Sequence, residues 1–255
     1  NAGSVDSDDV VVLLDYFGLI DLRATTEMIR GHLPRAVIVV DRVHSFFRGP
    51  EPGSDFAYTS LRKFVPVPDG GEVFVFGAQK GRHVELARNR KAFWASKLEG
   101  SRLKWAYNSN SASRSLEKEQ EFLKLFARGE TALNNMSEPR KISEVSRRRI
   151  DKVDPRIVIA RRRHNYCHLQ AGLEEYGMDI TRLRSDDVPL CLPTLWSDRD
   201  KLRRRLFDQR IFLPIHWPLP SELARRRSSL GRQMSEKELS LVIDQRYDCE
   251  DMERL

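Results

Sequence analysis

The sequence has few of the features that mark a metal-binding, disulfide-bonded or membrane-spanning protein. Its three cysteines, Cys167, Cys191 and Cys249, lie far apart without Cys-x-x-Cys spacing, which argues against a structural zinc site and a disulfide framework. No apolar run approaches the roughly 20 residues that a bilayer span needs, and no basic-then-apolar leader marks export. We therefore expect a protein of the reducing cytoplasm, with no metal and no membrane partner.

The sequence also lacks an initiating methionine. It begins Asn1-Ala2-Gly3-Ser4 and enters the strand-like segment VVVLLDYFG within ten residues. A sheet that starts so abruptly needs neighbours to cover its edges, so we expect a fragment or a processed product. A cloning or maturation scar on a complete domain is the alternative.

Charge is abundant. The chain of 255 residues is long enough for one large domain or two modest ones. Its residues are 40% hydrophobic and 32% charged, as in a globular protein. A net charge of +7 favours anionic partners, and arginines form four triplets, at 147–149, 161–163, 203–205 and 225–227. Because many acids lie nearby, we expect solvated or salt-bridged helix faces. No known nucleic-acid motif accompanies the triplets, so nucleic-acid binding is a minor alternative.

Apolar runs alternate with a helical pattern near the start of the chain. Residues 10–14 and 36–40 are typical of strands buried on both faces, and residues 22–32 between them form a helical pattern. This order predicts a right-handed βαβ unit with parallel strands. Extended structure resumes near Phe56, and a turn rich in proline and glycine at 66–71 leads to a strand at 72–76.

The rest of the chain predicts helices and then a second, smaller unit. Helical patterns cover 82–98, 116–126 and a long stretch from Pro155 to a terminator at Gly177, with a linker at 129–141. Further strands are predicted at 189–195, 211–215 and 239–243, with helices at 198–209, capped by Ser197, and at 248–255. We predict an α/β protein with a three-layer, mostly parallel sheet in residues 1–130, a linker and bridging helix in 131–175, and a small α+β C-terminal domain in 176–255.

Four polar side chains between the second and fourth strands could form a cofactor site. Asp41 ends a buried strand, where open α/β sheets bind ligands; His44 follows it, and Ser60 and Lys63 lie in a short polar break. Such groups suit pyridoxal 5′-phosphate (PLP): the acid keeps the pyridine nitrogen protonated, the lysine bonds the aldehyde and moves a proton, and the hydroxyl contacts the phosphate. Singly, each has an ordinary explanation as a cap, a solvated lysine or a half-buried histidine.

Their order and spacing resemble those of the fold-type-I PLP enzymes, in particular the DegT/StrS-like aminotransferases. Asp-x-x-His after a hydrophobic strand, the lysine of SLRK some twenty residues later, and Gly70-Gly71 at the seventh and eighth positions beyond that lysine are similar to the family's motif. The segments LLDYFG, IFLPIHWPLP and LSLVIDQRYDCEDM resemble it more loosely. The resemblance implies that Lys63 forms the Schiff base, Asp41 pairs with the pyridine nitrogen, His44 contacts the ring and Ser60 binds the phosphate.

The sequence departs from the family in two ways. Sugar-modifying members more often have Gln at position 44 and a serine further before the lysine. The family's first half, with an aromatic residue that stacks on the ring and a phosphate loop, has no counterpart in this sequence. We therefore expect this chain to supply the polar half of a PLP site.

The resemblance implies an aminotransferase that moves an amino group from a small-molecule donor to a keto acceptor, with a keto sugar among the candidates, and that works as a homodimer. His216 and Arg246 are the candidate substrate ligands, the latter for a carboxylate. A packing role for His216, and pairing of Arg246 with Asp244 or Asp248, are the alternatives. Two other functions remain open: a PLP-fold dehydratase or regulator without transamination, and a basic module that binds nucleic acid or phosphate-rich polymers.

Overall fold

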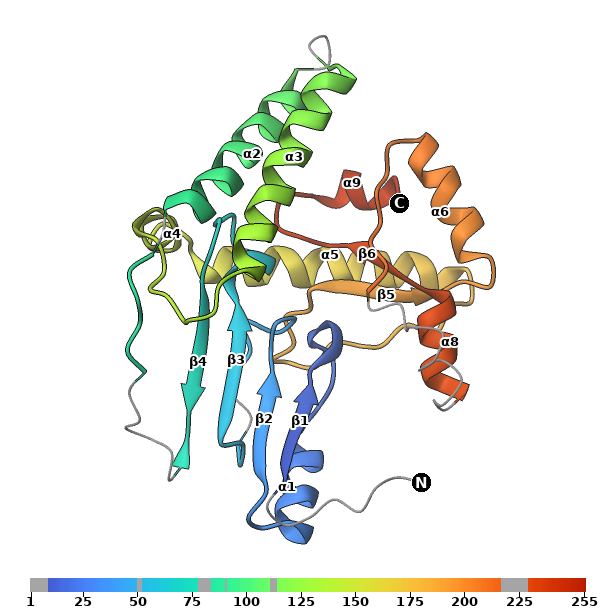
Figure 1. Cartoon of the computed structure of the whole chain (residues 1–255). Coiled ribbons are helices and arrows are strands. Elements are labelled where there is room, and N and C mark those ends of the chain that lie inside the picture. The colour runs from blue at the N-terminus through green and yellow to red at the C-terminus, as the bar shows by residue number, and fades with distance from the viewer. Residues whose placement is uncertain (1–8, 50–51, 78–83, 90, 111–113, 217–228) are drawn as a thin grey trace.

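A four-stranded sheet and a two-stranded sheet organise the computed structural model, which describes residues 9–49, 52–77, 84–89, 91–110, 114–216 and 229–255. The larger sheet has the order β1-β2-β3-β4 (Figure 1). Its strands are β1 (Val10–Leu14), β2 (Val37–Asp41), β3 (Phe56–Ser60) and β4 (Gly71–Val75).

The larger sheet is mixed, with mostly parallel strands, as predicted. β1 pairs with β2 and β2 with β3 in parallel, whereas β4 returns antiparallel to β3. Helix α1 (Arg23–His32) connects β1 to β2 and completes the predicted βαβ unit. Ile38, Val40 and Ala57 pack with Leu22 and the α1 residue Ile29 on one face. Because side chains alternate along a strand, the neighbouring residues project from the opposite face.

Two long helices form an antiparallel hairpin beyond the carboxyl end of β3 (Figure 1). They are α2 (Lys91–Ser109) and α3 (Leu116–Asn134). The prediction of a helix from 82 was wrong, because residues 84–89 are non-helical and Ala87 bridges to Arg140 instead. The predicted linker from 129 was also wrong in part. Gly129, taken as a break, is buried inside α3, where a Cβ atom would lie 2.7 Å from Lys97, so close helix packing overrides its poor helix propensity.

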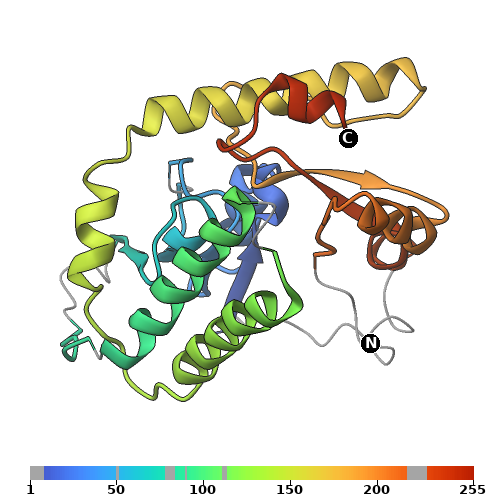
Figure 2. The ribbon, with the colours of Figure 1, turned by 90° about the horizontal axis from the view of Figure 1, so that it is seen from above.

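Helix α5 (Pro155–Glu175) is the long helix predicted from Pro155 to the terminator at Gly177. It follows the short α4 (Glu144–Ile150), begins after the capping side chain of Asp154 and ends before Gly177, whose φ is +77°. Figure 2 shows α5 running along the back of the molecule from one sheet towards the other. α5 contacts β5 (Cys191–Leu195) of the smaller sheet.

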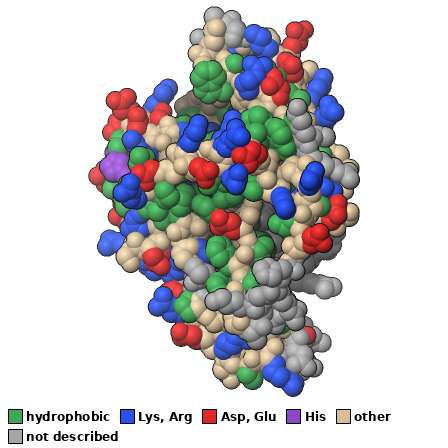
Figure 3. Space-filling view, turned by 90° about the vertical axis from the view of Figure 1, so that its left-hand side faces the viewer, with side chains coloured by type: hydrophobic (Ala, Val, Ile, Leu, Met, Phe, Trp, Pro, Cys, Tyr) green, Lys and Arg blue, Asp and Glu red, His purple; other side chains and the backbone are tan. Residues whose placement is uncertain are grey.

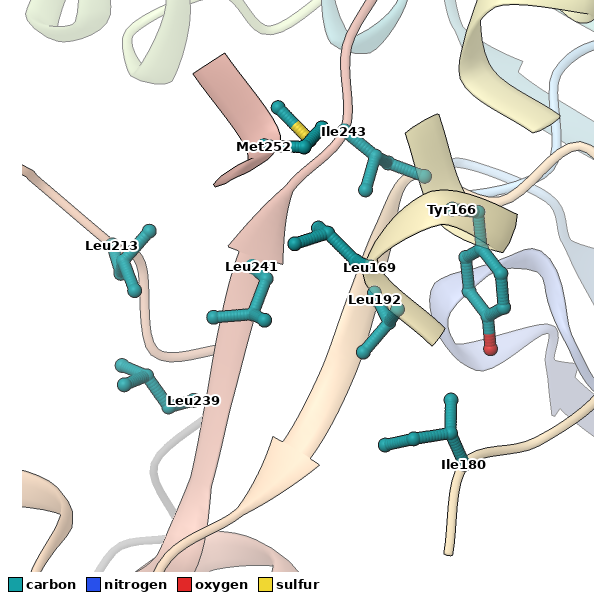
Figure 4. Packing of buried hydrophobic residues seen from close by; sticks show 9 residues of the cluster. All are labelled: Tyr166, Leu169, Ile180, Leu192, Leu213, Leu239, Leu241, Ile243 and Met252. Carbon is teal, nitrogen blue, oxygen red and sulfur yellow. The ribbon is translucent and has the colours of Figure 1, made fainter. Parts of the chain in front are cut away.

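The smaller sheet pairs β5 with β6 (Glu238–Val242) in antiparallel orientation. Helices α6 (Arg199–Asp208), α8 (Ser229–Lys237) and α9 (Cys249–Glu253) accompany it. The prediction of Ser197 as the cap of α6 was wrong, since Asp198 holds that position without a capping bond. Side chains from α5, β5, β6 and α9, and from the irregular segments between them, build a common core (Figure 4), which consists of Tyr166, Leu169, Ile180, Leu192, Leu213, Leu239, Leu241, Ile243 and Met252.

The predicted strand at 211–215 was wrong. This segment is irregular, although Leu213 is buried in the core and Pro214 accepts one backbone hydrogen bond from Ser240. An apolar run marks burial but does not show whether a pairing partner exists. Burial of this segment in the core, without pairing to another strand, is therefore enough to explain its apolar pattern.

The arginine triplets differ from one another. Arg147 and Arg148 pair with Glu144 at the surface, as expected. Arg162 contradicts the expectation of a solvated face: it is buried, donates to the carbonyls of Pro189 and Leu190, and lies 4.6 Å above the Phe64 ring. Burial lowers the pKa of Arg162 to about 10, so it remains a cation at neutral pH. The triplet at 225–227 lies outside the described residues.

Basic and acidic side chains are interspersed on the face shown in Figure 3, with hydrophobic side chains between them. The described residues of that face therefore form no continuous basic surface for a nucleic acid. In the part of the chain that the structure describes, no helix is both long and apolar enough to cross a membrane. The same residues contain no group of three or more His, Cys, Asp or Glu side chains placed to hold a metal ion.

Candidate functional site

The carboxyl ends of β2 and β3 hold an oriented carboxylate. Asp41 is the last residue of β2 and pairs with Tyr58 in β3, so both side chains project from the same face. The backbone N–H of Val43 donates to Asp41 Oδ1 over 2.9 Å, and the Tyr58 hydroxyl donates to Oδ2 over 2.9 Å. Burial and the neighbouring carboxylate raise the pKa of Tyr58 to about 12, so this hydroxyl keeps its proton. The Asp41 carboxylate is thus fixed in one orientation.

His44 is a buried, neutral imidazole. Its side chain lies in the loop after β2, and the backbone N–H of Phe17 donates to Nδ1 over 3.2 Å. Because Nδ1 accepts a hydrogen bond, the ring carries its proton on Nε2. Burial, followed by electrostatic interactions with His216 and Lys63, lowers the pKa of His44 to about 3. His44 therefore stays uncharged at neutral pH.

The turn after β1 is built against His44. This turn, η1 (Tyr16–Gly18), contains Phe17 at φ 60° and Gly18 at φ 76°, both in the left-handed region. A Cβ atom on Gly18 would lie 2.5 Å from the His44 carbonyl oxygen. Gly18 is needed both for its backbone conformation and for this close approach.

Substituting Gly18 by alanine should therefore destabilise the protein. The left-handed conformation alone costs an L-residue about 1–2 kcal/mol, and the clash with the His44 carbonyl adds to it. The free energy of unfolding in urea measures the loss. Gly31→Ala is the matched control: Gly31 is helical with open space around its Cβ position, so that variant should gain up to about 1 kcal/mol. Equal stability of the two variants would contradict the prediction.

Ser60 and Lys63 lie where the chain leaves β3. Ser60 ends the strand, and Lys63 ends the single turn η2 (Leu61–Lys63). Lys63 is exposed, and its charge contributes to the lowered pKa of both His44 and His216. Its amine thus lies close to two imidazoles that stay neutral at physiological pH.

Two cavities meet at Ser60. One, of about 280 Å³, is lined by Ser60 and Lys63 on one side and by residues of α2 and α3, including Lys97 and Phe126, on the other. The second, of about 560 Å³, extends from Ser60 and the Gly70-Gly71 turn towards the segment that follows α3. The Ser60 hydroxyl therefore borders space that a ligand could enter.

His216 brings the second half of the chain to this site. Its ring lies 5.1 Å from that of His44 and 5.8 Å from that of Phe17, edge to face in both cases. Burial, followed by the charge of Lys63, lowers the pKa of His216 to about 4. The structure therefore places His216 beside His44 and Lys63, although more than 150 residues separate it from either in the sequence.

Arg246 does not extend this cluster. Its guanidinium forms a bidentate ion pair with Asp244 and lies 5.6 Å above the Tyr247 ring. Its side chain is 72% exposed. The ion-pair alternative describes this residue better than a role as a substrate ligand.

Four residues of the site escaped the sequence analysis: Phe17, Tyr58, Glu238 and Ser240. Tyr58 contacts Asp41 only because of the β2–β3 register, which sequence periodicity does not specify. Glu238 and Ser240 alternate with leucines in the strand pattern ELSLV. Polar residues on one side of an otherwise apolar strand were a detectable signal of a buried polar site.

Comparisons with known proteins agree with this geometry at the level of the fold. No family model matches the sequence, and no curated protein matches it either. Solved structures do match. They include a GDP-4-keto-6-deoxymannose-3-dehydratase with bound GDP-perosamine (TM-score 0.59, 12% identity, covering 98% of this chain and 67% of that one). Another is the sugar aminotransferase CalS13 from Micromonospora echinospora (TM-score 0.56, 15% identity, 96% and 64%).

A third match carries the predicted family's name. It is a DegT DnrJ EryC1 StrS aminotransferase from Brucella abortus (TM-score 0.54, 13% identity, covering 95% of this chain and 61% of that one). The resemblance to fold-type-I PLP enzymes is therefore confirmed for the fold. This chain spans about 61–67% of the length of these three proteins.

Proposed function

We propose that this chain is part of a PLP-dependent aminotransferase, in which residues 1–130 contribute to the cofactor-binding domain, 131–175 form the connection and 176–255 form the small domain. The enzyme would be a cytoplasmic homodimer. The observation that carries the proposal is the position of Lys63: an exposed amine beside two neutral imidazoles, at the carboxyl edge of a sheet that also presents the oriented carboxylate of Asp41.

The residues of this edge fit PLP. A carboxylate accepts about four hydrogen bonds, and the bonds from Val43 and Tyr58 leave Asp41 able to accept one from a protonated pyridine nitrogen. His44 is neutral, so it can contact the ring without adding positive charge beside that nitrogen. Ser60 borders the cavity that Lys63 lines, which suits a phosphate ligand.

Each residue would have a distinct role. When bound, PLP supplies an electron sink for the carbanion that forms at the substrate. The Lys63 amine would bond to the cofactor aldehyde with loss of water and, once released, would carry the proton at the substrate α-carbon. Asp41 would keep the pyridine nitrogen protonated. Ser60 would hold the phosphate, and His216 would contact the substrate.

A keto sugar is our proposed amino acceptor. Two proteins with a similar fold support this choice: one is a sugar aminotransferase, and the other is a dehydratase that holds a nucleotide sugar. Nitrogen transfer to a panel of keto sugars and keto acids would test the choice.

Reductive trapping tests the cofactor site directly. With limiting PLP and borohydride, the lysine bonded to the cofactor becomes permanently labelled, and peptide mass mapping then locates it. We expect the label on Lys63, in clear preference over the exposed Lys201 of α6. Label spread evenly over the exposed lysines would contradict the proposal.

A dehydratase without transamination is the second candidate. It is favoured by the match to a GDP-4-keto-6-deoxymannose-3-dehydratase, which has the same fold over 98% of this chain. Cofactor trapped on Lys63, together with no nitrogen transfer to any keto acceptor and loss of a sugar hydroxyl, would support this candidate over the first.

A further inference from the structure

A chain of buried polar groups leads from the small sheet to His216. Glu238 and Ser240 lie two residues apart in β6, so their side chains share one face of the strand. The leucines that alternate with them, Leu239 and Leu241, belong to the hydrophobic core (Figure 4). Glu238 and Ser240 are 1% and 0% exposed. Buried polar groups of this kind are stable only when they are hydrogen-bonded.

These side chains hold His216 at two points. The backbone N–H of His216 donates to Glu238 Oε2 over 3.0 Å. The other carboxylate oxygen is hydrogen-bonded to the Ser240 hydroxyl, whose oxygen lies 2.6 Å from His216 Nδ1. A continuous path of hydrogen bonds therefore joins a buried carboxyl group to the imidazole beside His44 and Lys63.

The hydrogen bonds along this path can be arranged in two ways, because each group has a fixed number of hydrogen atoms to donate. A serine hydroxyl has one hydrogen to donate and accepts up to two hydrogen bonds. Burial raises the pKa of the Cys191 thiol to about 12, so the thiol near Ser240 keeps its own proton and takes none from the relay. Ser240 can then donate to Glu238 while it accepts from His216 Nδ1–H. Alternatively, it accepts from a protonated Glu238 and donates to Nδ1. Both arrangements satisfy every group.

We propose that Glu238, Ser240 and His216 form a proton relay. When His216 Nε2 accepts a proton, the Nδ1 proton passes to Ser240 Oγ, and the Ser240 hydroxyl proton passes to Glu238 Oε1. The charge of the relay changes from −1 to 0, and the imidazole is neutral before and after. Glu238 and Ser240 are positioning residues, because they act through His216.

The surroundings favour a proton on the carboxyl group over an imidazolium. Burial raises the pKa of Glu238, whereas burial and the Lys63 charge lower that of His216. Among the described residues, the other titratable or charged groups that face the relay are His44 at the imidazole, Cys191 at Ser240 and Arg199 at Glu238. A positive charge on His216 would be repelled by Lys63, and transfer to Glu238 removes that charge from the site.

The relay adds to the proposed function. It rests on that function in one respect only, the identity of the group that exchanges protons with His216 Nε2. Lys63 is the described amine whose charge acts on both imidazoles. A proton that Lys63 releases could therefore be stored at Glu238, away from the reacting atoms, and later returned.

Nitrogen NMR of the cofactor-free protein, with ¹⁵N-labelled histidine, tests the relay without reference to activity. His216→Gln identifies the His216 signals. In the wild-type protein we expect His216 to remain neutral while its proton moves from Nδ1 to Nε2 as the pH falls through the pKa of Glu238. Ser240→Ala should abolish this tautomer switch, and Ser240→Thr, which keeps the hydroxyl, should restore it. Glu238→Gln should make the tautomer independent of pH.

Two results would overturn the relay: conversion of wild-type His216 directly to an imidazolium, or the same tautomer behaviour in Ser240→Ala as in Ser240→Thr. Circular dichroism of each variant checks that it folds. If PLP does not label Lys63 but the tautomer switch is present, the proposed function fails and the relay stands. If PLP labels Lys63 but the tautomer switch is absent, the relay is wrong and the proposed function stands.

Discussion

Replacing Lys63 by alanine is expected to abolish covalent cofactor binding and nitrogen transfer together. Alanine has no amine to bond to the PLP aldehyde and no group to carry the proton at the substrate α-carbon. Loss of a positioned acid–base group alone slows a reaction by about 10²–10⁴-fold. Absorbance of the protein titrated with PLP reports the bond, and single-turnover nitrogen transfer reports the chemistry.

Two further variants provide the comparison for that experiment. Lys201→Ala removes an exposed amine from α6 and should leave both measurements unchanged. Lys63→Arg keeps the positive charge beside His44 and His216 but cannot form the bond, so it should resemble the alanine variant. A spectrum of Lys63→Ala identical to that of the wild type would rule out the assignment of this lysine.

Replacing Arg48 by alanine is expected to lower the free energy of unfolding by about 3–5 kcal/mol, the usual cost of breaking a buried ion pair. The Arg48 side chain is 6% exposed and lies between two buried carboxylates, with Nη1 3.3 Å from Asp15 Oδ2 and 3.9 Å from Asp187 Oδ1. It also donates to the Ile20 carbonyl. Removing it leaves Asp15, from the turn after β1, buried without its partner. Urea denaturation at neutral pH measures the loss.

The effect should depend on pH in a defined direction. Burial raises the pKa of Asp15 even with Arg48 present, so the folded state binds this proton at a higher pH than the unfolded chain. Stability from this group is therefore lost as the pH rises through the folded pKa. Without Arg48 that pKa rises further, so the deficit of the variant should be largest at neutral pH and should shrink in acid.

Arg148→Ala is the matched control for Arg48. Arg148 forms an exposed ion pair with Glu144 at helical spacing i,i+4, which is worth about 0.3–0.5 kcal/mol. The two arginine variants remove the same charge from the protein. Effects of independent substitutions usually add to within about 0.5 kcal/mol. If the free energies of unfolding of the two variants differ by less than this, the buried ion pairs of Arg48 do not stabilise the fold as predicted.

Local patterns predicted much of the fold. The βαβ unit, the long helix α5 and the strand at β6 follow from apolar periodicity and from end signals such as Pro155 and Gly177. These signals act between neighbours in the chain, so the sequence contains them in readable form. The spacing from Asp41 to Gly71 led in the same way to a fold that the structural matches confirm.

Patterns failed where long-range packing decided the outcome. Gly129 resembles a helix break, yet α3 continues through it because Lys97 packs against the bare backbone. Arg162 resembles a surface residue, yet the Phe64 ring and two carbonyls from another segment enclose it. Each error concerns a contact between residues far apart in the sequence.

By itself, the sequence determined the local elements and the order of Asp41, His44, Ser60 and Lys63, because period, turn chemistry and spacing are properties of neighbouring residues. Only the tertiary structure decided what these side chains touch. Strand register placed Tyr58 on Asp41, and packing of the small sheet brought His216, with Glu238 and Ser240 behind it, to His44. Such contacts depend on how separate elements bury their surfaces together, which no local pattern records.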